Sequence, residues 1–458
     1  MRDRSSATDV VTIVGGGLAG SEAAWQLAQR GHTVRLHEMR PVRPTAAHRT
    51  DRLAELVCSN TFKSTELATA HGLLKAELRE LGSLILTAAD EARIAAGSAL
   101  AVDRDMFAAG VTGRLLAHPN VTVVREEVTE VPAGPALIAT GPLTSDTLAA
   151  ALRERLGAAA LAFYDAIAPV VSAESIDESI VFRASRYGKE TMDGADQDGA
   201  YLNAPMTADE YDAFIDALSS ADQHQGHAFD EVPYFEGCMP VEEMASRGRE
   251  TLRFGPLKPV GLRDPRTNAM PHAVVQLRRE DRAGRMWNLV GFQSRLRIPE
   301  QQRVFRLIPG LADAEFLRYG SIHRNSYLNT PAVLSETLSL RDDPMILLAG
   351  QVTGVEGYTE STATGLLAGI NIARMLTGDQ AILPPPTTML GALYRHLREA
   401  DPAHFQPMNA NFGLLDELPV RVRDKREKKE RMATRALEAM RAWREEHAIA
   451  APAALAGA

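Results

Sequence analysis

Apolar and polar positions along this chain follow the alternation of strand and helix that is typical of an α/β protein. A β-branched run, Val10–Val14, precedes a small-residue stretch with helical periodicity that reaches Arg30. A second strand-like run begins at Thr33 and ends at His37. Short apolar runs of this kind, bounded by turn residues, are typical of buried parallel strands. The pattern therefore predicts a strand–helix–strand unit at the start of an α/β domain.

The same alternation continues along the chain. The further elements expected on these grounds are helices over 72–86, from 101 and over 361–376, and strands at 121–124, 136–142 and 345–351. These elements extend the first unit into a larger doubly wound domain.

The pattern of apolar and polar residues changes in the middle of the chain, where strand-like runs at 273–277 and 286–292 are separated by proline-containing turns. We interpret this region as an insertion. The predicted fold class is α/β, a Rossmann-type domain with an inserted α+β domain and a helical C-terminal tail. The expected parts are 1–150 (Rossmann-type domain, first part), 151–335 (insertion), 336–380 (Rossmann-type domain, second part) and 381–458 (basic helical tail).

A glycine motif, G-x-G-x-x-G, stands between the first strand and the first helix, at Gly15–Gly20. Gly15 permits the tight turn, Gly17 lets a pyrophosphate approach the backbone, and Gly20 lets the helix pack close to the strand. The helix N-terminus offers N–H groups and a positive dipole to the phosphates. Glu38, 18 residues beyond Gly20, is placed to accept hydrogen bonds from adenosine ribose hydroxyls. The unit predicts a bound dinucleotide.

Two later segments favour FAD over NAD as that dinucleotide. The strand at 136–142 ends in Thr140-Gly141, and flavoproteins with two dinucleotide-binding domains use such an ending where the chain returns beside the cofactor. The run at 345–351 contains Gly350 and is followed by Gly354 and a helix whose N-terminus would face the flavin. The Rossmann-type domain, 1–150 and 336–380, is therefore predicted to be an FAD-binding domain. Because no second G-x-G-x-x-G occurs, we expect NAD(P)H to dock transiently over the flavin.

Composition and charge narrow the class of protein. The 458 residues exceed one compact core, and 45% hydrophobic and 24% charged residues are ordinary for a globular chain. Without a bilayer-length apolar run or a signal segment, we expect a cytoplasmic protein with no membrane partner. The net charge of −9 argues against a general polyanion binder. The stretch 419–445 nevertheless holds ten Lys or Arg against five Asp or Glu, which fits either an RNA-backbone contact or a solvated helix with internal ion pairs.

The chain has two cysteines, Cys58 and Cys238, and neither belongs to a CxxC motif or a His/Cys cluster, so no metal site is expected. Cys58 lies in a segment that can fold back over a flavin, and Cys238 lies in a turn before Pro240. Both could be small buried hydrophobes. If they are functional, their wide separation favours thiolate nucleophiles over a redox disulfide.

A series of longer motifs then runs in order through residues 10–445: VGGGLAGSEAAWQLAQRG, HEMRPVRPTAAH, ELVCSN, ATGPLTS, FRASRYG, FEGCMPVEEMASRG, TLRFGPLKPVGL, MWNLVGFQ, HRNSYLN, AGQVTGVEGYTES and FQPMNANFG. Together these motifs resemble the folate- and FAD-dependent tRNA (uracil-5-)-methyltransferases, the TrmFO family of small Gid-type flavoproteins.

The resemblance implies transfer of the one-carbon unit of 5,10-methylenetetrahydrofolate to C5 of uridine 54 in the tRNA T-loop. FAD, reduced by NAD(P)H, would give the final hydride. It implies that Cys238 adds to uracil C6 and that Cys58 lies beside the flavin, although these roles could be reversed. His323, Arg324 and Asn325 are implied to face the folate, with a solvent-exposed loop as the alternative. The residues implied to bind FAD are Gly15, Gly16, Gly17, Leu18, Ala19, Gly20, Glu38, Arg40, Thr140, Gly141, Gly350 and Gly354.

Two other functions remain open from the sequence. The larger Gid relatives modify the wobble uridine of tRNA with FAD and folate, but they carry an additional C-terminal helical domain for which this chain is too short. An FAD- and NAD(P)H-dependent oxidoreductase of small molecules would keep the FAD motifs and leave the basic tail and Cys238 without a role.

Overall fold

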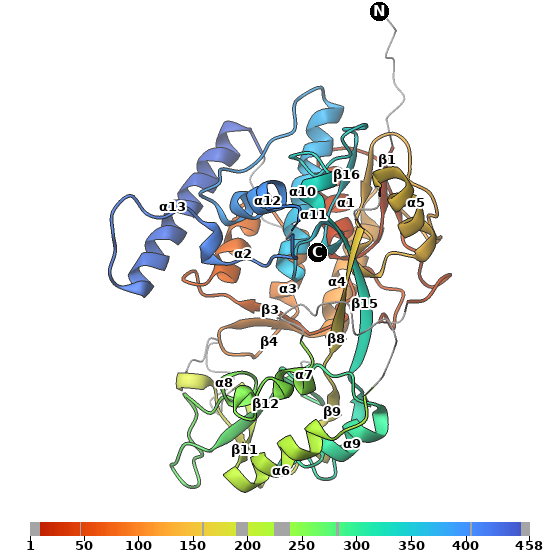
Figure 1. Ribbon diagram of the computed structural model, residues 1–458. Coiled ribbons are helices and arrows are strands. Elements are labelled where there is room, and N and C mark those ends of the chain that lie inside the picture. The colour runs from red at the N-terminus through yellow and green to blue at the C-terminus, as the bar shows by residue number, and fades with distance from the viewer. Residues whose placement is uncertain are drawn as a thin grey trace, which may run out of the picture.

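Two lobes joined by a two-stranded ribbon make up the molecule (Figure 1). The computed structural model of the chain describes residues 10–45, 47–157, 160–188, 200–223, 239–280, 284–403 and 405–449. The upper lobe in Figure 1 contains both the beginning and the end of the described chain, and the lower lobe contains its middle. The order of the lobes along the chain therefore is upper, lower, upper.

A five-stranded parallel sheet forms the centre of the upper lobe. Its order is β16-β7-β1-β2-β6, and every neighbouring pair is parallel. The strands are β1 (Val11–Val14), β2 (Val34–His37), β6 (Val121–Val124), β7 (Ala136–Ile138) and β16 (Ile346–Leu348). The strands expected from the apolar runs are confirmed. Strand β16 comes from a late segment of the chain and lies beside β7, and β7 is two strands from β2 in the sheet order. All carboxyl ends meet at one edge of the sheet, where α/β proteins bind ligands.

Helix α1 (Leu18–Gln29) and helix α11 (Tyr358–Leu376) pack against each other with little space between their backbones. A Cβ atom on Gly365 would lie 2.2 Å from the Ala19 carbonyl oxygen, and one on Gly369 would lie 2.9 Å from the Ala23 carbonyl oxygen. Only glycine allows these approaches. The small residues of the late helix therefore bring its N-terminus next to the glycine motif.

The other helices of the upper lobe surround this pair. They are α2 (Ala70–Glu80), α3 (Leu84–Glu91), α4 (Arg104–Ala117), α5 (Asp146–Leu156), α10 (Thr330–Val333), α12 (Met389–Glu399) and α13 (Lys425–Glu446). The single helix expected over 72–86 is two helices, because the chain turns at Gly82 and the Ser83 side chain accepts a hydrogen bond from Leu86 N and caps a new helix.

A small antiparallel sheet at the base of the upper lobe was not expected from the sequence. It has the order β3-β5-β4, with β3 (Thr61–Ser64), β4 (Arg93–Ile94) and β5 (Ala99–Val102). Strand β5 occupies the start of the segment expected to be helical from 101. The helix begins only at Arg104, where the Asp103 side chain accepts a hydrogen bond from Met106 N.

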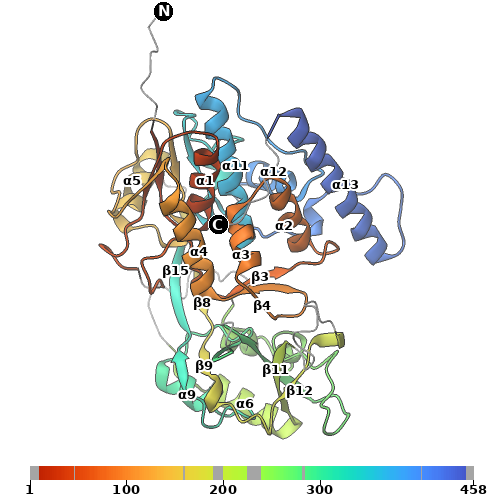
Figure 2. The same cartoon turned by 180° about the vertical axis from the view of Figure 1, so that it is seen from behind.

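The lower lobe contains a six-stranded antiparallel sheet with helices packed against it (Figure 2). The sheet order is β10-β11-β12-β13-β9-β14. The elements are β9 (Val170–Ser172), β10 (Phe182–Arg183), β11 (Tyr201–Met206), β12 (Ala273–Arg279), β13 (Met286–Leu289), β14 (Phe316–Arg318), α6 (Ala208–Ser219), α7 (Val241–Ser246), α8 (Thr251–Phe254) and α9 (Ile298–Phe305). Both strands expected here are present, as β12 and β13. The lobe has its own apolar core, separate from that of the upper lobe.

The ribbon between the lobes consists of β8 (Ala160–Ile167) and β15 (Ser321–Leu328), which pair antiparallel along their whole length. Strand β8 leads into the lower lobe and β15 returns from it, so the two crossings of the chain lie side by side (Figure 1).

The basic tail is a packed helix. On α13, Met440 and Trp443 are buried, and Arg441 and Arg444 both form ion pairs with Glu80 of α2. Part of the excess positive charge of the tail is therefore used within the molecule. Searched over the described residues, the helices include none with the length and apolar character needed to cross a bilayer.

Candidate flavin site

A hollow with an empty volume of about 1020 Å³ opens at the carboxyl ends of β1, β2, β7 and β16. It lies between α1 and α11, the helices that the glycines bring together. The lining residues are 14–19, 37–40, Thr45, His48, Glu55, Val57, 126–128, 139–145, Leu148, Gly350, Gln351, Tyr358 and Ser361.

The glycine motif forms one wall of this hollow, and glycine is required for a different reason at each of its three positions. Gly15 has φ +105°, and a Cβ there would lie 2.5 Å from the Ala139 carbonyl oxygen. A Cβ on Gly17 would meet nothing within 4 Å, so its backbone is accessible from the hollow. A Cβ on Gly20 would lie 1.9 Å from the Gly15 carbonyl oxygen, beneath the loop and outside the hollow's lining. These placements match the three roles expected of the glycines.

Helix α1 begins at this loop without a side-chain cap on its N-terminus. The cap residue is Gly17, and Leu18 and Ala19 line the hollow. The backbone N–H groups of the first turn of a helix have no intrahelical partners and carry partial positive charge. The loop and this turn therefore suit a pyrophosphate.

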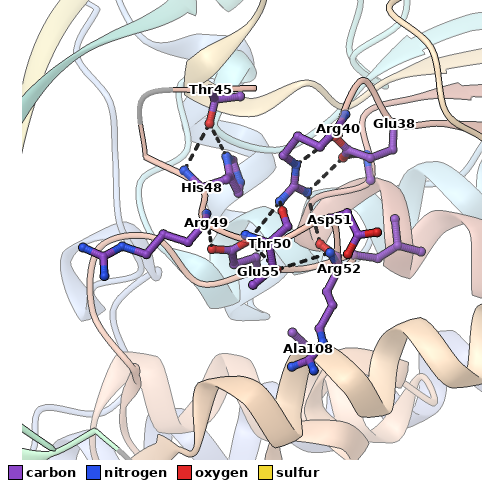
Figure 3. A network of polar contacts seen from close by, with 12 residues as sticks. Glu38, Arg40, Thr45, His48, Arg49, Thr50, Asp51, Arg52, Glu55 and Ala108 are labelled. Atoms are coloured by element: carbon purple, nitrogen blue, oxygen red, sulfur yellow. Dashed lines mark hydrogen bonds and ion pairs between the residues drawn. The ribbon is translucent and has the colours of Figure 1, made fainter. Parts of the chain in front are cut away.

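Glu38 and Arg40 form a buried pair beside the glycine motif (Figure 3). Glu38 Oε2 accepts a hydrogen bond from Gly16 N at 3.1 Å, and Glu38 Oε1 accepts one from Arg40 Nε at 2.9 Å. Arg40 also donates to Glu55 Oε2 at 3.0 Å, which draws the loop around residue 55 over the site. Burial raises the pKa of Glu38, but the hydrogen bonds and positive charge of Arg40 outweigh it and hold the pKa below the usual glutamate value. Glu38 is therefore an ionised acceptor at the ribose end.

The two segments that favoured FAD in the sequence, at 136–142 and 345–354, both contribute residues to the lining of this hollow. Thr140 and Gly141 line it after β7, and Gly350 and Gln351 line it after β16. Gly354 does not belong to the lining. Its φ is +82°, and a Cβ there would lie 2.5 Å from the Phe405 ring, so its place in the fold is a close approach to that ring.

The N-terminus of α11 closes the other end of the hollow. Its cap residue, Gly357, gives no side-chain cap, and Tyr358 and Ser361 of its first turn line the hollow. Two helix N-termini without side-chain caps thus border the hollow, and Glu38 lines it as well. This arrangement fits FAD, whose pyrophosphate and flavin would each meet one N-terminus.

Cys58 lies next to Val57, which lines the hollow, and contacts the first turn of α11. Its backbone N–H and that of Ser59 donate to the Tyr358 hydroxyl at 2.9 and 3.0 Å, and that hydroxyl donates to the Ser59 carbonyl oxygen. Burial is the largest effect on Tyr358 and raises the pKa of its hydroxyl well above the usual value. The phenol is therefore a neutral hydrogen-bonding group that fixes the Cys58 segment next to Val57, which lines the hollow.

The lower lobe meets the same segment through a buried polar contact. Arg104 donates from Nη2 to the Cys58 carbonyl oxygen at 3.1 Å and forms an ion pair with Glu280 of the lower lobe at 2.5 Å. Asn60, fully buried, donates to the Arg279 carbonyl oxygen at 2.7 Å and accepts from Arg278 Nε at 2.9 Å. The flavin end thus lies where the two lobes touch.

The remaining expected site residues are placed in part. His323, Arg324 and Asn325 are in β15, opposite residues 163–165 of β8, so they belong to the ribbon and not to a loop. Cys238 falls outside the described residues. Within the described parts of the chain, no group of three or more His, Cys, Asp or Glu side chains is arranged to hold a metal ion.

Several lining residues were not expected from the sequence. Thr45, His48 and Val57 come from an irregular loop, and Tyr358 and Ser361 come from the first turn of α11. Loop residues of this kind carry no periodicity. Each of them nevertheless lies in one of the longer motifs: HEMRPVRPTAAH contains Thr45 and His48, ELVCSN contains Val57, and AGQVTGVEGYTES contains Tyr358 and Ser361.

Comparison with known proteins agrees with this architecture. The family described as "Glucose inhibited division protein A" matches residues 10–380. Among solved structures, GidA of Aquifex aeolicus in its form II crystal superposes with a TM-score of 0.70, at 16% identity, over 96% of this chain and 75% of that one. That likeness supports the fold alone.

Closer relatives are found by sequence. The "Methylenetetrahydrofolate--tRNA-(uracil-5-)-methyltransferase TrmFO" of Geobacter sulfurreducens is 56% identical over 95% of this chain and 99% of its own length. The protein of the same name from Bacillus subtilis is 52% identical over 93% of this chain and 97% of its own length. The chain belongs to the glucose-inhibited division protein A family and, within it, to the TrmFO group of tRNA (uracil-5-)-methyltransferases.

Proposed function

We propose that this protein is a methylenetetrahydrofolate- and FAD-dependent tRNA (uracil-5-)-methyltransferase that converts uridine 54 of the T-loop to 5-methyluridine. The observation that supports it most strongly is the 56% identity to the TrmFO enzyme of Geobacter sulfurreducens, which extends over nearly the full length of both chains. The hollow at the carboxyl ends of the parallel strands, whose lining includes Val57 next to Cys58, fits this chemistry.

The chain's own residues would hold FAD in one orientation. The first turn of α1 binds the pyrophosphate, Glu38 accepts from the ribose, and the first turn of α11 receives the flavin beside Tyr358. FAD, when bound and reduced, supplies the hydride that completes the methyl group. We propose NAD(P)H as its reductant and the cytoplasm as the place of action.

The cysteines activate the base. Uracil C5 is a poor nucleophile until a nucleophile adds at C6. In our proposal the Cys238 thiolate adds to C6, and C5 forms a bond to the folate-derived methylene carbon. Loss of the C5 proton and departure of the tetrahydrofolate nitrogen then leave an exocyclic methylene on C5. Its reduction by hydride to a methyl group lets the Cys238 thiolate leave C6, which restores the C5–C6 double bond. Cys58, held by Arg104 and Tyr358 at the flavin end, is assigned to acid–base or protective work there.

The decisive measurement is product formation on tRNA. We expect the FAD-loaded protein, given unmodified tRNA transcript, labelled methylenetetrahydrofolate and NADPH, to yield labelled 5-methyluridine in the nucleoside digest. A transcript with cytidine at position 54 is the matched control and should stay unlabelled.

The result also separates the alternative functions. Label at the wobble position would indicate the activity of the larger Gid relatives, and NADPH oxidation without label in RNA would indicate a small-molecule oxidoreductase. Cys238→Ala should abolish labelling, at least 10³-fold as an order-of-magnitude estimate for loss of a nucleophile. Retained labelling in that variant would reassign the nucleophile to Cys58.

A further inference from the structure

Tyr187 holds an exposed aromatic ring against the backbone of another loop of the lower lobe. The residue is 66% exposed, and a Cβ atom on Gly261 would lie 2.8–3.0 Å from three carbons of its ring. Because these three carbons are at nearly the same distance, one face of the ring covers Gly261. The exposure of the side chain then belongs to the opposite face of the ring.

The backbone at Tyr187 is strained, and hydrogen bonds hold it in place. Its φ of 59° and ψ of 22° lie in the left-handed region, which a bulky residue rarely adopts. Tyr187 N donates to the Gly261 carbonyl oxygen at 3.0 Å. The preceding side chain, Arg186, donates to the carbonyl oxygens of Val260 at 2.7 Å and Lys258 at 2.6 Å. Strained residues that the surrounding structure holds this firmly are common at ligand-binding sites.

The side chains around the ring carry positive charge without acidic partners. The Arg186 guanidinium donates to backbone oxygens, and Arg263 Nη1 donates to the Asn268 carbonyl oxygen at 3.0 Å. Lys258 and Arg263 are both exposed. Searched over the described residues, none of the three cations forms an ion pair with a carboxylate. In a chain of net charge −9, this local excess of positive charge favours an anionic partner.

An open hollow with an empty volume of about 840 Å³ adjoins the ring. Gly261, which the ring covers, belongs to its lining, and Met270, 56% exposed, adds apolar surface. The full lining is Ala184, Ser185, Gly261, Leu262, Arg263 and Met270. A flat ring, an apolar hollow and unpaired cations in one place suit a nucleotide, which combines a flat base with a charged phosphate.

This surface lies on the sheet face that leads to the Cys58 segment. Arg186 Nε donates to Gln276 Oε1 at 2.9 Å. Gln276 and Arg278 are two residues apart in β12 and therefore point to the same face of the sheet. Arg278 Nε donates to Asn60 Oδ1 at 2.9 Å, and Asn60 is two residues from Cys58. An RNA whose target base reaches the flavin end can therefore extend along this face to the exposed ring.

We propose that Tyr187 stacks on an unpaired base of the tRNA T-loop and that Lys258 and Arg263 contact the neighbouring phosphates. This inference rests on the proposed function. Proteins bind single-stranded RNA loops by stacking their bases on aromatic side chains, and every base has a face that can stack. Contacts of Lys and Arg with phosphates add affinity that falls as salt is raised.

The test compares two ligands on the FAD-loaded protein. Dissociation constants are measured for unmodified tRNA transcript by the anisotropy of an end label, and for tetrahydrofolate by the change in flavin absorbance. Tyr187→Gly removes the ring, and glycine adopts the same backbone conformation without strain, so the fold is kept. We expect this variant to weaken tRNA binding about tenfold and to leave tetrahydrofolate binding unchanged. Tyr187→Phe keeps the ring and should bind tRNA within about twofold of the unaltered protein.

Two further comparisons separate stacking from charge. A fully paired duplex of the T-stem offers no free base, so Tyr187→Gly and the unaltered protein should bind it equally. Lys258→Gln should weaken tRNA binding about threefold and reduce the slope of log Kd against log salt concentration by about one. The matched control is Arg306→Gln, which removes an exposed charge from the same lobe, where the guanidinium donates to the Ala314 carbonyl oxygen. It should change neither quantity.

Several results would overturn the inference. Unchanged tRNA affinity in Tyr187→Gly would show that no base stacks on the ring, and an equal loss in Tyr187→Phe would show that the ring is not the group that binds. Loss of tetrahydrofolate binding with unchanged tRNA binding would assign the ring to the folate. Unlabelled RNA in the methylation assay would refute the proposed function alone, because tRNA affinity is measured without turnover.

Discussion

The glycine motif places different demands on neighbouring residues. Gly17 has open space on the side of the hollow, whereas Gly20 has a carbonyl oxygen where a side chain would begin. Gly17 leaves room for the ligand, whereas Gly20 allows α1 to approach the loop. Chemically identical residues therefore fail in different ways when they are replaced.

Gly20→Ala tests this difference at the residue scale. A Cβ at 1.9 Å from the Gly15 carbonyl oxygen must push α1 away from the loop, which displaces the pyrophosphate site. We expect most of the bound flavin to be lost on purification, read as flavin absorbance per protein. Gly113→Ala in α4 adds the same methyl group where nothing lies within 4 Å, and it should keep its flavin and gain up to about 1 kcal/mol. Full flavin content in Gly20→Ala would contradict the argument.

At the scale of elements, buried glutamates cap helices other than their own. Glu77 of α2 accepts hydrogen bonds from Met389 N at 2.7 Å and Leu390 N at 2.9 Å, at the start of α12. Glu22 of α1 does the same for α3, accepting from Leu84 N and Ile85 N. These contacts join helices that are far apart in sequence, and they fix the tail of the chain against α2.

The cap at Glu77 predicts a pH dependence of stability. Burial raises the pKa of Glu77 to about 8, against the opposing effect of the two amides. Between about pH 4.3 and 8 the folded state then holds a proton that the unfolded chain releases, so the free energy of unfolding falls as pH rises, by up to about 1.4 kcal/mol per pH unit.

Glu77→Gln removes this titration and keeps an oxygen acceptor. Relative to the variant, the unaltered protein should lose stability between pH 5 and pH 8, measured by urea unfolding. Glu130→Gln, at an exposed position, is the control and should run parallel to the unaltered protein. If the free energy of unfolding of Glu77→Gln also ran parallel to that of the unaltered protein between pH 5 and pH 8, Glu77 would be ionised throughout this range.

The elements also show where sequence reasoning succeeds and stops. The five parallel strands were predicted because each is a short apolar run between turns, and Gly15, Gly17 and Glu38 were placed by a local motif. The sheet of β3, β5 and β4 was missed because its strands have two to four residues and no clear alternation. The contacts of Tyr358 with Cys58 and of Arg104 with Glu280 join distant segments, which no local pattern records.

At the scale of the whole molecule, one buried acid contributes to the contact between the lobes. Glu280 has a 3% exposed side chain, and the positive charges of Arg104 and Arg318 overcome the effect of burial and hold its pKa below the usual value. It is the carboxylate partner of an arginine from the opposite lobe. Removing the charge of Glu280 should weaken the contact between the lobes more than it lowers the stability of either lobe.

Glu280→Gln leaves buried guanidinium groups without their counter-charge, at an expected cost of about 3 kcal/mol. We expect the lobes to unfold in two separate calorimetric transitions, or in one at a clearly lower temperature. Glu315→Gln, on the exposed surface of the same lobe, should match the unaltered protein. An unchanged melting profile in Glu280→Gln would show that the ribbon alone couples the lobes.

The ribbon carries a consequence for the history of the fold. At every rung from Ala160 opposite Leu328 to Ile167 opposite Ser321, the outgoing and returning chains are neighbours. A single insertion into the hairpin of β8 and β15 could therefore have added the lower lobe without any change in the strand order of the parallel sheet. A tight turn that closes the same hairpin should restore an ancestral flavin-binding unit.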